Sequence, residues 1–152
     1  GHGFGGLVDE YITNQGQTIN SAAISEYNQW SALGFFANVD LVSNLANIKW
    51  KHFVGVDGYS RVGAYEGGYG FTYGVWRAEN TSCMINNILY FSAPSREIMV
   101  KRILTRANMY YSLQNFIAND IEKSPSAAAA AIYSKGFDAL TFKPLGTPVL
   151  KY

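Results

Sequence analysis

The clearest periodic pattern in the chain lies between residues 94 and 119. Apolar side chains recur there at intervals of three and four, which places them on one face of an α-helix. The residues on this face are Met99, Ile103, Ala107, Tyr110, Leu113 and Ile117. Pro94 suits the first helical turn, and Glu97 suits the positive end of the helix dipole. The pattern predicts one long amphipathic helix over residues 94–119.

The pattern before this helix is less regular. Short apolar runs at 34–36, 39–42 and 48–56 are separated by Asn, Ser and Gly, which indicates long loops with a few short strands. Residues 61–91 are rich in glycine and aromatic residues, and they predict a functional loop region. The first twelve residues contain too much glycine to start a helix alone. They are compatible with the end of a helix that stops at Gly5 and Gly6.

The last part of the chain has a different composition. A short helix is predicted over residues 126–135, with Gly136 as its C-cap, although its five-alanine run also suits a spacer. Pro144 and Pro148 favour an extended conformation for residues 137–152. The chain therefore divides into residues 1–122 and a terminal part, residues 123–152, that holds the short helix and an extended tail.

The composition limits the classes of protein that fit. With 152 residues the chain has the size of one domain, and its 48% hydrophobic content argues against a disordered chain. No apolar run reaches the length of a membrane-spanning helix. The net charge of +1 gives no electrostatic basis for binding nucleic acid. Only 15% of the residues are charged, and a surface of Tyr, Asn, Ser and Gly favours a secreted or cell-envelope protein.

Few residues offer recognisable catalytic chemistry. The single cysteine, Cys83, excludes an internal disulfide and an all-cysteine zinc site, and it is predicted to be a small apolar filler. The chain has two histidines and no G-x-S-x-G or phosphate-binding motif. His52 lies in a strand-like run and is predicted to be an ordinary surface or packing residue.

His2 lies in the strongest chemical pattern of the chain. It is followed by Gly5 and then by Asp9 and Glu10. In the extended zincin motif, the second zinc histidine is followed by a glycine that turns the chain and by a third ligand. The first histidine and the general-base glutamate would then precede Gly1, so the chain is expected to be a fragment. On these residues alone, a flexible terminal histidine followed by an acid pair remains an alternative.

Three blocks resemble the bacterial immunoglobulin A peptidase family, a group of metzincin-like zinc metallopeptidases. They are GHGFGGLVDEY at residues 1–11, KWKHF at residues 49–53, and the long block at residues 63–103 that contains YEGG, WRAENTSCM and PSRE. The resemblance implies an α+β fold that is the C-terminal part of a metzincin-type catalytic domain, with long loops, a few short strands and one long helix. It also implies a zinc-dependent endopeptidase that acts on proteins or peptides.

The resemblance assigns roles to individual residues. His2 matches the second zinc histidine, Asp9 matches the acidic third ligand, and Met84 matches the Met-turn methionine beneath the metal. The residue six positions after His2 is Val8, which cannot bind a metal. The third ligand therefore comes later, with Asp9 favoured over Glu10, and Glu10 is then expected to orient a ligand.

A second departure from the metzincin pattern concerns a tyrosine. Asn86 stands where some metzincins have a tyrosine two residues after the Met-turn. A hydroxyl for the transition state is then expected from Tyr65, Tyr69 or Tyr73, and Tyr65 and Tyr69 are predicted to bind substrate.

Three functions therefore compete. The leading prediction is a zinc endopeptidase whose partners are a protein or peptide substrate and the segment of the same protein that precedes Gly1. The alternative is a non-catalytic extracellular module in which aromatic loops bind carbohydrate or protein. A third possibility is a degenerate peptidase homologue that has lost the metal.

Overall fold

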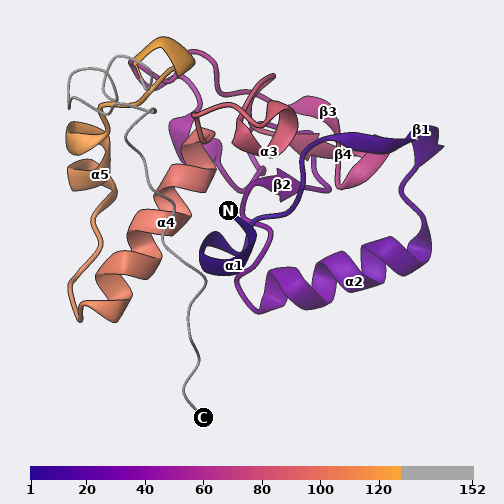
Figure 1. Ribbon diagram of the computed structural model, residues 1–152, viewed down its shortest axis with the longest axis horizontal. Coiled ribbons are helices and arrows are strands. Elements are labelled where there is room, and N and C mark those ends of the chain that lie inside the picture. Colours follow the sequence, from indigo (N-terminus) through magenta and orange to yellow (C-terminus); the bar gives the residue numbers. More distant parts are fainter. Residues whose placement is uncertain (128–152) are drawn as a thin grey trace, which may run out of the picture.

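The computed structural model describes residues 1–127, in which helices pack around a small mixed sheet (Figure 1). The predicted α+β class is confirmed at this level. The elements in chain order are α1 (His2–Gly5), β1 (Ile12–Thr18), α2 (Ser21–Ala32), β2 (Val39–Asp40), a 3-10 turn η1 (Lys51–Phe53), β3 (Tyr65–Gly68), β4 (Gly70–Arg77), α3 (Cys83–Asn86), α4 (Ala93–Arg106) and α5 (Leu113–Asn119).

β4 is the strand to which the other three strands pair. It runs parallel to β1 and antiparallel to β2 and β3. The prediction of a loop region over residues 61–91 was therefore wrong for β3 and β4. Glycines obscured these strands, and Gly74 shows why the strand needs one: its φ is +83°, and a Cβ atom there would lie 2.9 Å from Ile19. A glycine in a strand often marks such a close approach of another segment.

The predicted helix over residues 94–119 is two helices in the structure. α4 ends at Arg106, and Asn108 follows with a φ of +54°. The amide of Met109 donates to the carbonyl of Leu104, and the amide of Asn108 donates to that of Thr105. These two bonds form a Schellman motif, in which asparagine can take the left-handed position. The chain then reverses, and α5 runs beside α4 (Figure 1).

The region between residues 13 and 60 also differs from its prediction. It contains α2, whose N-cap Asn20 accepts a hydrogen bond from the amide of Ala23. α2 gave no periodic signal because Tyr27 is its one buried residue. Of the predicted apolar strand runs, the run at 39–42 contains the short strand β2, whereas the run at 48–56 forms turns around η1.

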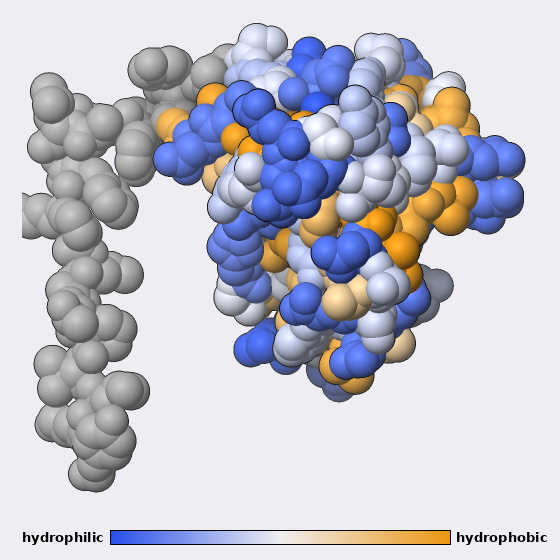
Figure 2. Space-filling model, turned by 90° about the vertical axis from the view of Figure 1, so that its right-hand side faces the viewer, coloured by the Kyte–Doolittle hydropathy of each residue, from blue (hydrophilic) through white to orange (hydrophobic). Residues whose placement is uncertain are grey.

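Two hydrophobic clusters hold these elements together. The larger one joins the 48–62 turns to the β4 end, α4 and α5, through Ile48, Trp50, Phe53, Tyr59, Val62, Ala78, Ala93 and Phe116. The smaller one joins α2 to the sheet, through Ile19, Tyr27, Val39, Phe71 and Val75. On the side of the molecule where β1 leads into α2, apolar residues lie in patches bordered by hydrophilic ones (Figure 2).

Two further predictions concern the whole chain. Among the helices of residues 1–127, none has the length and apolar character needed to cross a membrane. The short helix predicted over residues 126–135 and the tail at 137–152 lie almost entirely outside the described residues.

Candidate functional site

The two metal ligands predicted within this chain, His2 and Asp9, lie side by side. α1 ends in Gly6, which has a left-handed φ of +60° and reverses the chain. This reversal brings Asp9 back to the helix, so that Asp9 Oδ1 lies 3.1 Å from His2 Nε2. The His2 side chain is 63% exposed and the Asp9 side chain 35% exposed. Both groups therefore remain accessible from solvent.

A hydrogen bond at the other ring nitrogen of His2 determines which nitrogen carries the proton. His2 Nδ1 lies 3.0 Å from the carbonyl oxygen of Leu7. A carbonyl oxygen only accepts, so Nδ1 carries a proton, and Nε2 presents a lone pair in the neutral ring. A lone pair that faces the Asp9 carboxylate needs a second proton or a bound cation between them. Zinc-binding histidines commonly donate their other N–H to a backbone carbonyl in this way.

The donor set and its spacing fit zinc. An imidazole nitrogen and a carboxylate oxygen are both zinc ligands, and tetrahedral ligands at the usual bond lengths lie about 3.3 Å apart. The observed separation of His2 Nε2 and Asp9 Oδ1 is 3.1 Å. Within residues 1–127, no group of three or more His, Cys, Asp or Glu side chains is placed to hold a metal. This part of the chain thus offers two ligands, and a closed site needs others.

Glu10 points in the opposite direction from Asp9. Its side chain is 1% exposed, and its carboxylate accepts hydrogen bonds from Asn38 Nδ2 at 2.8 Å and from the Ser82 hydroxyl at 2.7 Å. Burial raises the pKa of Glu10 to about 7 against the lowering effect of these bonds. Asn38 also pairs with both backbone groups of Val8. Glu10 therefore anchors the segment that carries Asp9 and does not face His2.

Met84 lies directly against the start of α1. A Cβ atom on Gly1 would come within 2.6 Å of Met84 Sδ, and the methionine is 6% exposed. Met84 belongs to the single-turn helix α3, which Ser82 caps. The amide of Glu10 donates to the Met84 carbonyl at 2.9 Å. Glu10 thus bonds to this turn through both its backbone and its side chain.

The tyrosines named from the sequence have other contacts. The Tyr65 hydroxyl donates to the carbonyl of Arg61, and the Tyr69 ring packs between Phe36 and Phe71. Burial, followed by a hydrogen bond to Glu26, raises the pKa of Tyr69 to about 12. Their role in substrate binding stays a prediction.

A further tyrosine near Asp9 is Tyr11, which the sequence analysis did not single out. The Asp9 carboxylate raises the pKa of the Tyr11 hydroxyl above its ordinary value. A signal for it was present, since Tyr11 comes two residues after Asp9 in D-E-Y.

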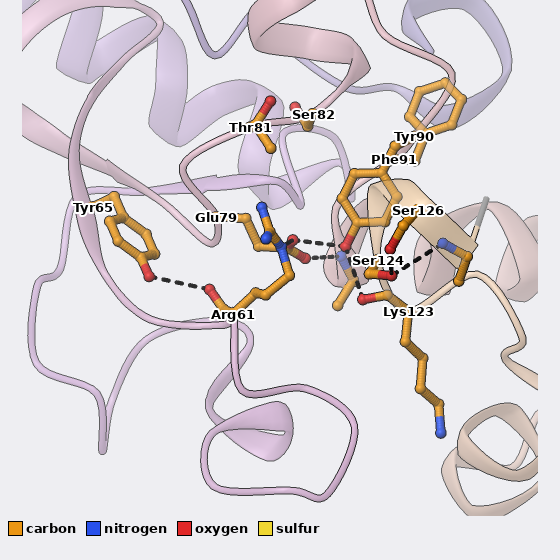
Figure 3. A network of polar contacts seen from close by, with 12 residues as sticks. Arg61, Tyr65, Glu79, Thr81, Ser82, Tyr90, Phe91, Lys123, Ser124 and Ser126 are labelled. Atoms are coloured by element: carbon orange, nitrogen blue, oxygen red, sulfur yellow. Dashed lines mark hydrogen bonds and ion pairs between the residues drawn. The ribbon is translucent and has the colours of Figure 1, made fainter. Parts of the chain in front are cut away.

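His52 and Glu79 take part in two further sets of polar contacts. His52 lies in η1 and not in a strand, and its Nε2 is 2.9 Å from Glu97 Oε2. Glu79 lies between Arg61 and Tyr90, as Figure 3 shows. Its carboxylate accepts from the Tyr90 hydroxyl at 2.7 Å and from the amide of Ala93 at 2.9 Å. These buried contacts connect the end of β4 to the start of α4.

Comparison with known proteins finds no family model, no curated protein and no solved structure that matches this chain. The inference of function therefore depends on the geometry around His2 and Asp9.

Proposed function

We propose that this chain is part of a secreted or cell-envelope zinc endopeptidase of the metzincin type, to which it contributes two metal ligands, His2 and Asp9. One observation carries the proposal. His2 Nε2 lies 3.1 Å from Asp9 Oδ1 while His2 Nδ1 bonds to a backbone carbonyl. A neutral histidine held in this way directs its lone pair at the carboxylate, which is the arrangement of two ligands that share a cation.

Burial supports the choice of Asp9 over Glu10. Glu10 has both carboxylate oxygens engaged in the interior, whereas Asp9 is open to solvent. A catalytic zinc site keeps one position open for water or substrate. The close approach of Met84 to Gly1, the residue before α1, supports a Met-turn role for Met84.

The division of roles follows from these contacts. When bound, zinc supplies Lewis-acid chemistry that polarises a carbonyl and acidifies water. His2 and Asp9 hold the metal, and Leu7 holds the ring of His2 in the tautomer that leaves Nε2 free. The remaining histidine and the glutamate that takes the proton from water are expected from the segment before Gly1. The substrate is a protein or a peptide.

The test is a metal titration on the full-length protein, including the segment that precedes Gly1. We expect about one zinc per chain in the wild-type protein. Asp9→Ala and His2→Ala should each weaken zinc binding by more than about 100-fold, because each removes a ligand. Asp57→Ala is the matched control, since Asp57 is an exposed carboxylate in a distant turn. Hydrolysis of a generic protein substrate should require zinc and stop on addition of a chelator.

Each outcome separates the candidate functions. Equal zinc content in Asp9→Ala and the wild-type protein would remove Asp9 from the site. Zinc binding without hydrolysis would contradict the endopeptidase and indicate an inactive homologue that keeps the metal. The absence of zinc binding in the full-length protein would favour either the degenerate homologue that has lost the metal or the non-catalytic binding module, in which exposed aromatics such as Trp30 and Tyr73 contact the partner.

A further inference from the structure

The side chain of Asn38 binds the chain on both sides of Asp9. The amide of Val8 donates to Asn38 Oδ1 at 3.1 Å, and the carbonyl of Val8 accepts from Asn38 Nδ2 at 2.7 Å. The same Nδ2, which has two N–H groups, also donates to Glu10 Oε1 at 2.8 Å. Asn38 is fully buried, so water does not compete for these three bonds. One side chain thus holds the residue before Asp9 and the residue after it.

We infer that Asn38 is a positioning residue of the proposed zinc site, where it fixes the backbone on both sides of Asp9 so that the carboxylate lies beside His2. This inference rests on the proposed function and names a residue that neither the resemblance nor the metal-ligand pattern assigned. Asn38 acts through Val8 and Glu10 and is not itself a ligand.

The position of the Asp9 carboxylate depends on the backbone that carries it. The side chain is 35% exposed beside His2, so the packing of the interior does not hold it. The left-handed φ of Gly6 starts the reversal, but glycine permits many conformations and does not by itself fix the direction of the chain. The amide of Tyr69 holds the carbonyl of Asp9 at 2.9 Å. The bonds from Asn38 to the two neighbouring residues add the restraint that sets the orientation of Asp9.

Asn38 is itself held by the sheet. It comes directly before β2, whose first residue, Val39, is fully buried and pairs with β4. The Tyr27 hydroxyl donates to the carbonyl of Val39 at 3.2 Å. Two residues before Asn38, the amide of Phe36 donates to the carbonyl of Gly6 at 2.8 Å. A functional site is held accurately when its supports belong to rigid elements of this kind.

The three bonds of Asn38 require an amide and suggest the variant that tests them. Asn38→Asp keeps the shape of the side chain and the oxygen that accepts from the amide of Val8. It replaces the donor nitrogen by an oxygen, which then faces the carbonyl of Val8 and the carboxylate of Glu10. The variant therefore breaks two of the three bonds without leaving a cavity. Asn38→Ala removes all three and serves as the second variant.

The experiment compares these variants with the wild-type full-length protein. We expect zinc affinity in a competition titration to be about 10- to 100-fold weaker, the range found when the outer partners of metal ligands are removed. The absorption spectrum of the cobalt-substituted protein should also change, because the carboxylate ligand is displaced. The matched control is Asp120→Asn, another exchange of acid and amide at a buried side chain, which binds Arg96 at 2.8 Å. It should lower the midpoint of denaturant unfolding but leave zinc affinity and the cobalt spectrum unchanged.

The outcomes distinguish this inference from the proposal on which it rests. If zinc binding depends on His2 and Asp9 but is unchanged in folded Asn38→Asp, the positioning role is wrong and the zinc site stands. If Asp120→Asn weakens zinc binding as much as Asn38→Asp for the same loss of stability, the role of Asn38 is structural. If the wild-type protein binds no zinc, both the site and the role of Asn38 are overturned.

Discussion

Two carboxylates of this molecule, Asp9 and Glu79, differ in their exposure to solvent and in their hydrogen-bond partners. Glu79 is 1% exposed, and its oxygens accept from the Tyr90 hydroxyl and the Ala93 amide. Asp9 is partly open to solvent and faces His2, whose lone pair needs a cation or a proton. The protein supplies hydrogen-bond donors to the buried carboxylate of Glu79, whereas it leaves the carboxylate of Asp9 partly accessible to solvent. A buried carboxylate with its acceptors used stabilises a junction, and an open one can bind a ligand.

The location of each carboxylate in the chain explains the difference. Glu79 follows β4 and precedes α4, so it lies where two elements meet and must satisfy the first amide of the helix. Asp9 follows the reversal at Gly6, and its side chain is 35% exposed beside His2. Its neighbour Glu10 takes the inward position and is closed in the same manner as Glu79.

The largest effect on stability should come from the closed carboxylate. Glu79→Ala leaves the Tyr90 hydroxyl and the Ala93 amide without their acceptor, and each buried unsatisfied group costs about 1–3 kcal/mol. We therefore expect a loss of about 2–4 kcal/mol in the free energy of unfolding, measured by denaturant titration. The same change at the exposed Asp57 should have an effect within about 0.5 kcal/mol. Similar losses at both positions would mean that the junction is not closed as described.

A second buried carboxylate, that of Glu97, should make the free energy of unfolding depend on pH in the acidic range. Burial alone would raise the pKa of Glu97, but the hydrogen bonds it accepts outweigh burial and lower the pKa to about 2. Its carboxylate contacts His52 Nε2 at 2.9 Å, Lys101 Nζ at 2.7 Å and the Tyr111 hydroxyl at 2.7 Å.

The sign of this acid dependence follows from proton binding. Between about pH 4.5 and pH 2 the unfolded chain binds a proton at Glu97 that the folded protein does not. Stability from this group is present above that window and is lost as the pH falls through it, at no more than about 1.4 kcal/mol per pH unit. Denaturant titrations across the window should show a smaller slope in Glu97→Gln. An equal slope would show that other groups cause the acid sensitivity.

The sequence predicted the helix end near His2 better than the fold around it. The reversal at Gly5 and Gly6 and the choice of Asp9 came from local patterns, because glycine permits a left-handed turn whatever surrounds it. The end of α4 at Arg106 was missed because hydrophobic periodicity does not reveal that Asn108 takes a left-handed φ of +54°. β4 was missed because its glycines reflect close contacts with residues far away in the sequence, such as that of Gly74 with Ile19, the residue after β1.

The buried polar residues were the hardest to predict. Glu10, Glu79 and Glu97 are each less than 9% exposed, and their partners are up to 72 residues distant in the sequence. Hydrophobic periodicity places charged residues outside, so it cannot find a carboxylate that depends on distant donors for its burial. Their positions follow from the tertiary structure alone.

A smaller effect should come from the C-terminal half of α4, where the predicted helical face is reversed. Ile103, expected to be buried, is 54% exposed. Arg102, which lies outside the predicted apolar face, donates to the carbonyl of Gly34 at 3.1 Å and lies 5.1 Å from the centre of the Phe35 ring. We expect Arg102→Ala to cost about 1–2 kcal/mol and Ile103→Ala less than about 1 kcal/mol. If denaturant titrations gave the opposite order, Ile103 would be on the buried face as predicted, and the contacts of Arg102 with Gly34 and Phe35 would be wrong.

The smallest effect on stability is expected at Asp9, and it is the sharpest test of the comparison with Glu79. Asp9→Ala removes a partly exposed carboxylate whose backbone carbonyl still accepts from Tyr69, so the extended segment should keep its place. The free energy of unfolding of the metal-free protein should change by no more than about 0.5 kcal/mol. The segment is anchored one residue later, where Glu10 bonds to Asn38 and to the Ser82 turn. If Asp9→Ala destabilised the metal-free protein as strongly as Glu79→Ala, Asp9 would be a structural anchor. The proposal that Asp9 is a metal ligand beside His2 would then lose its support.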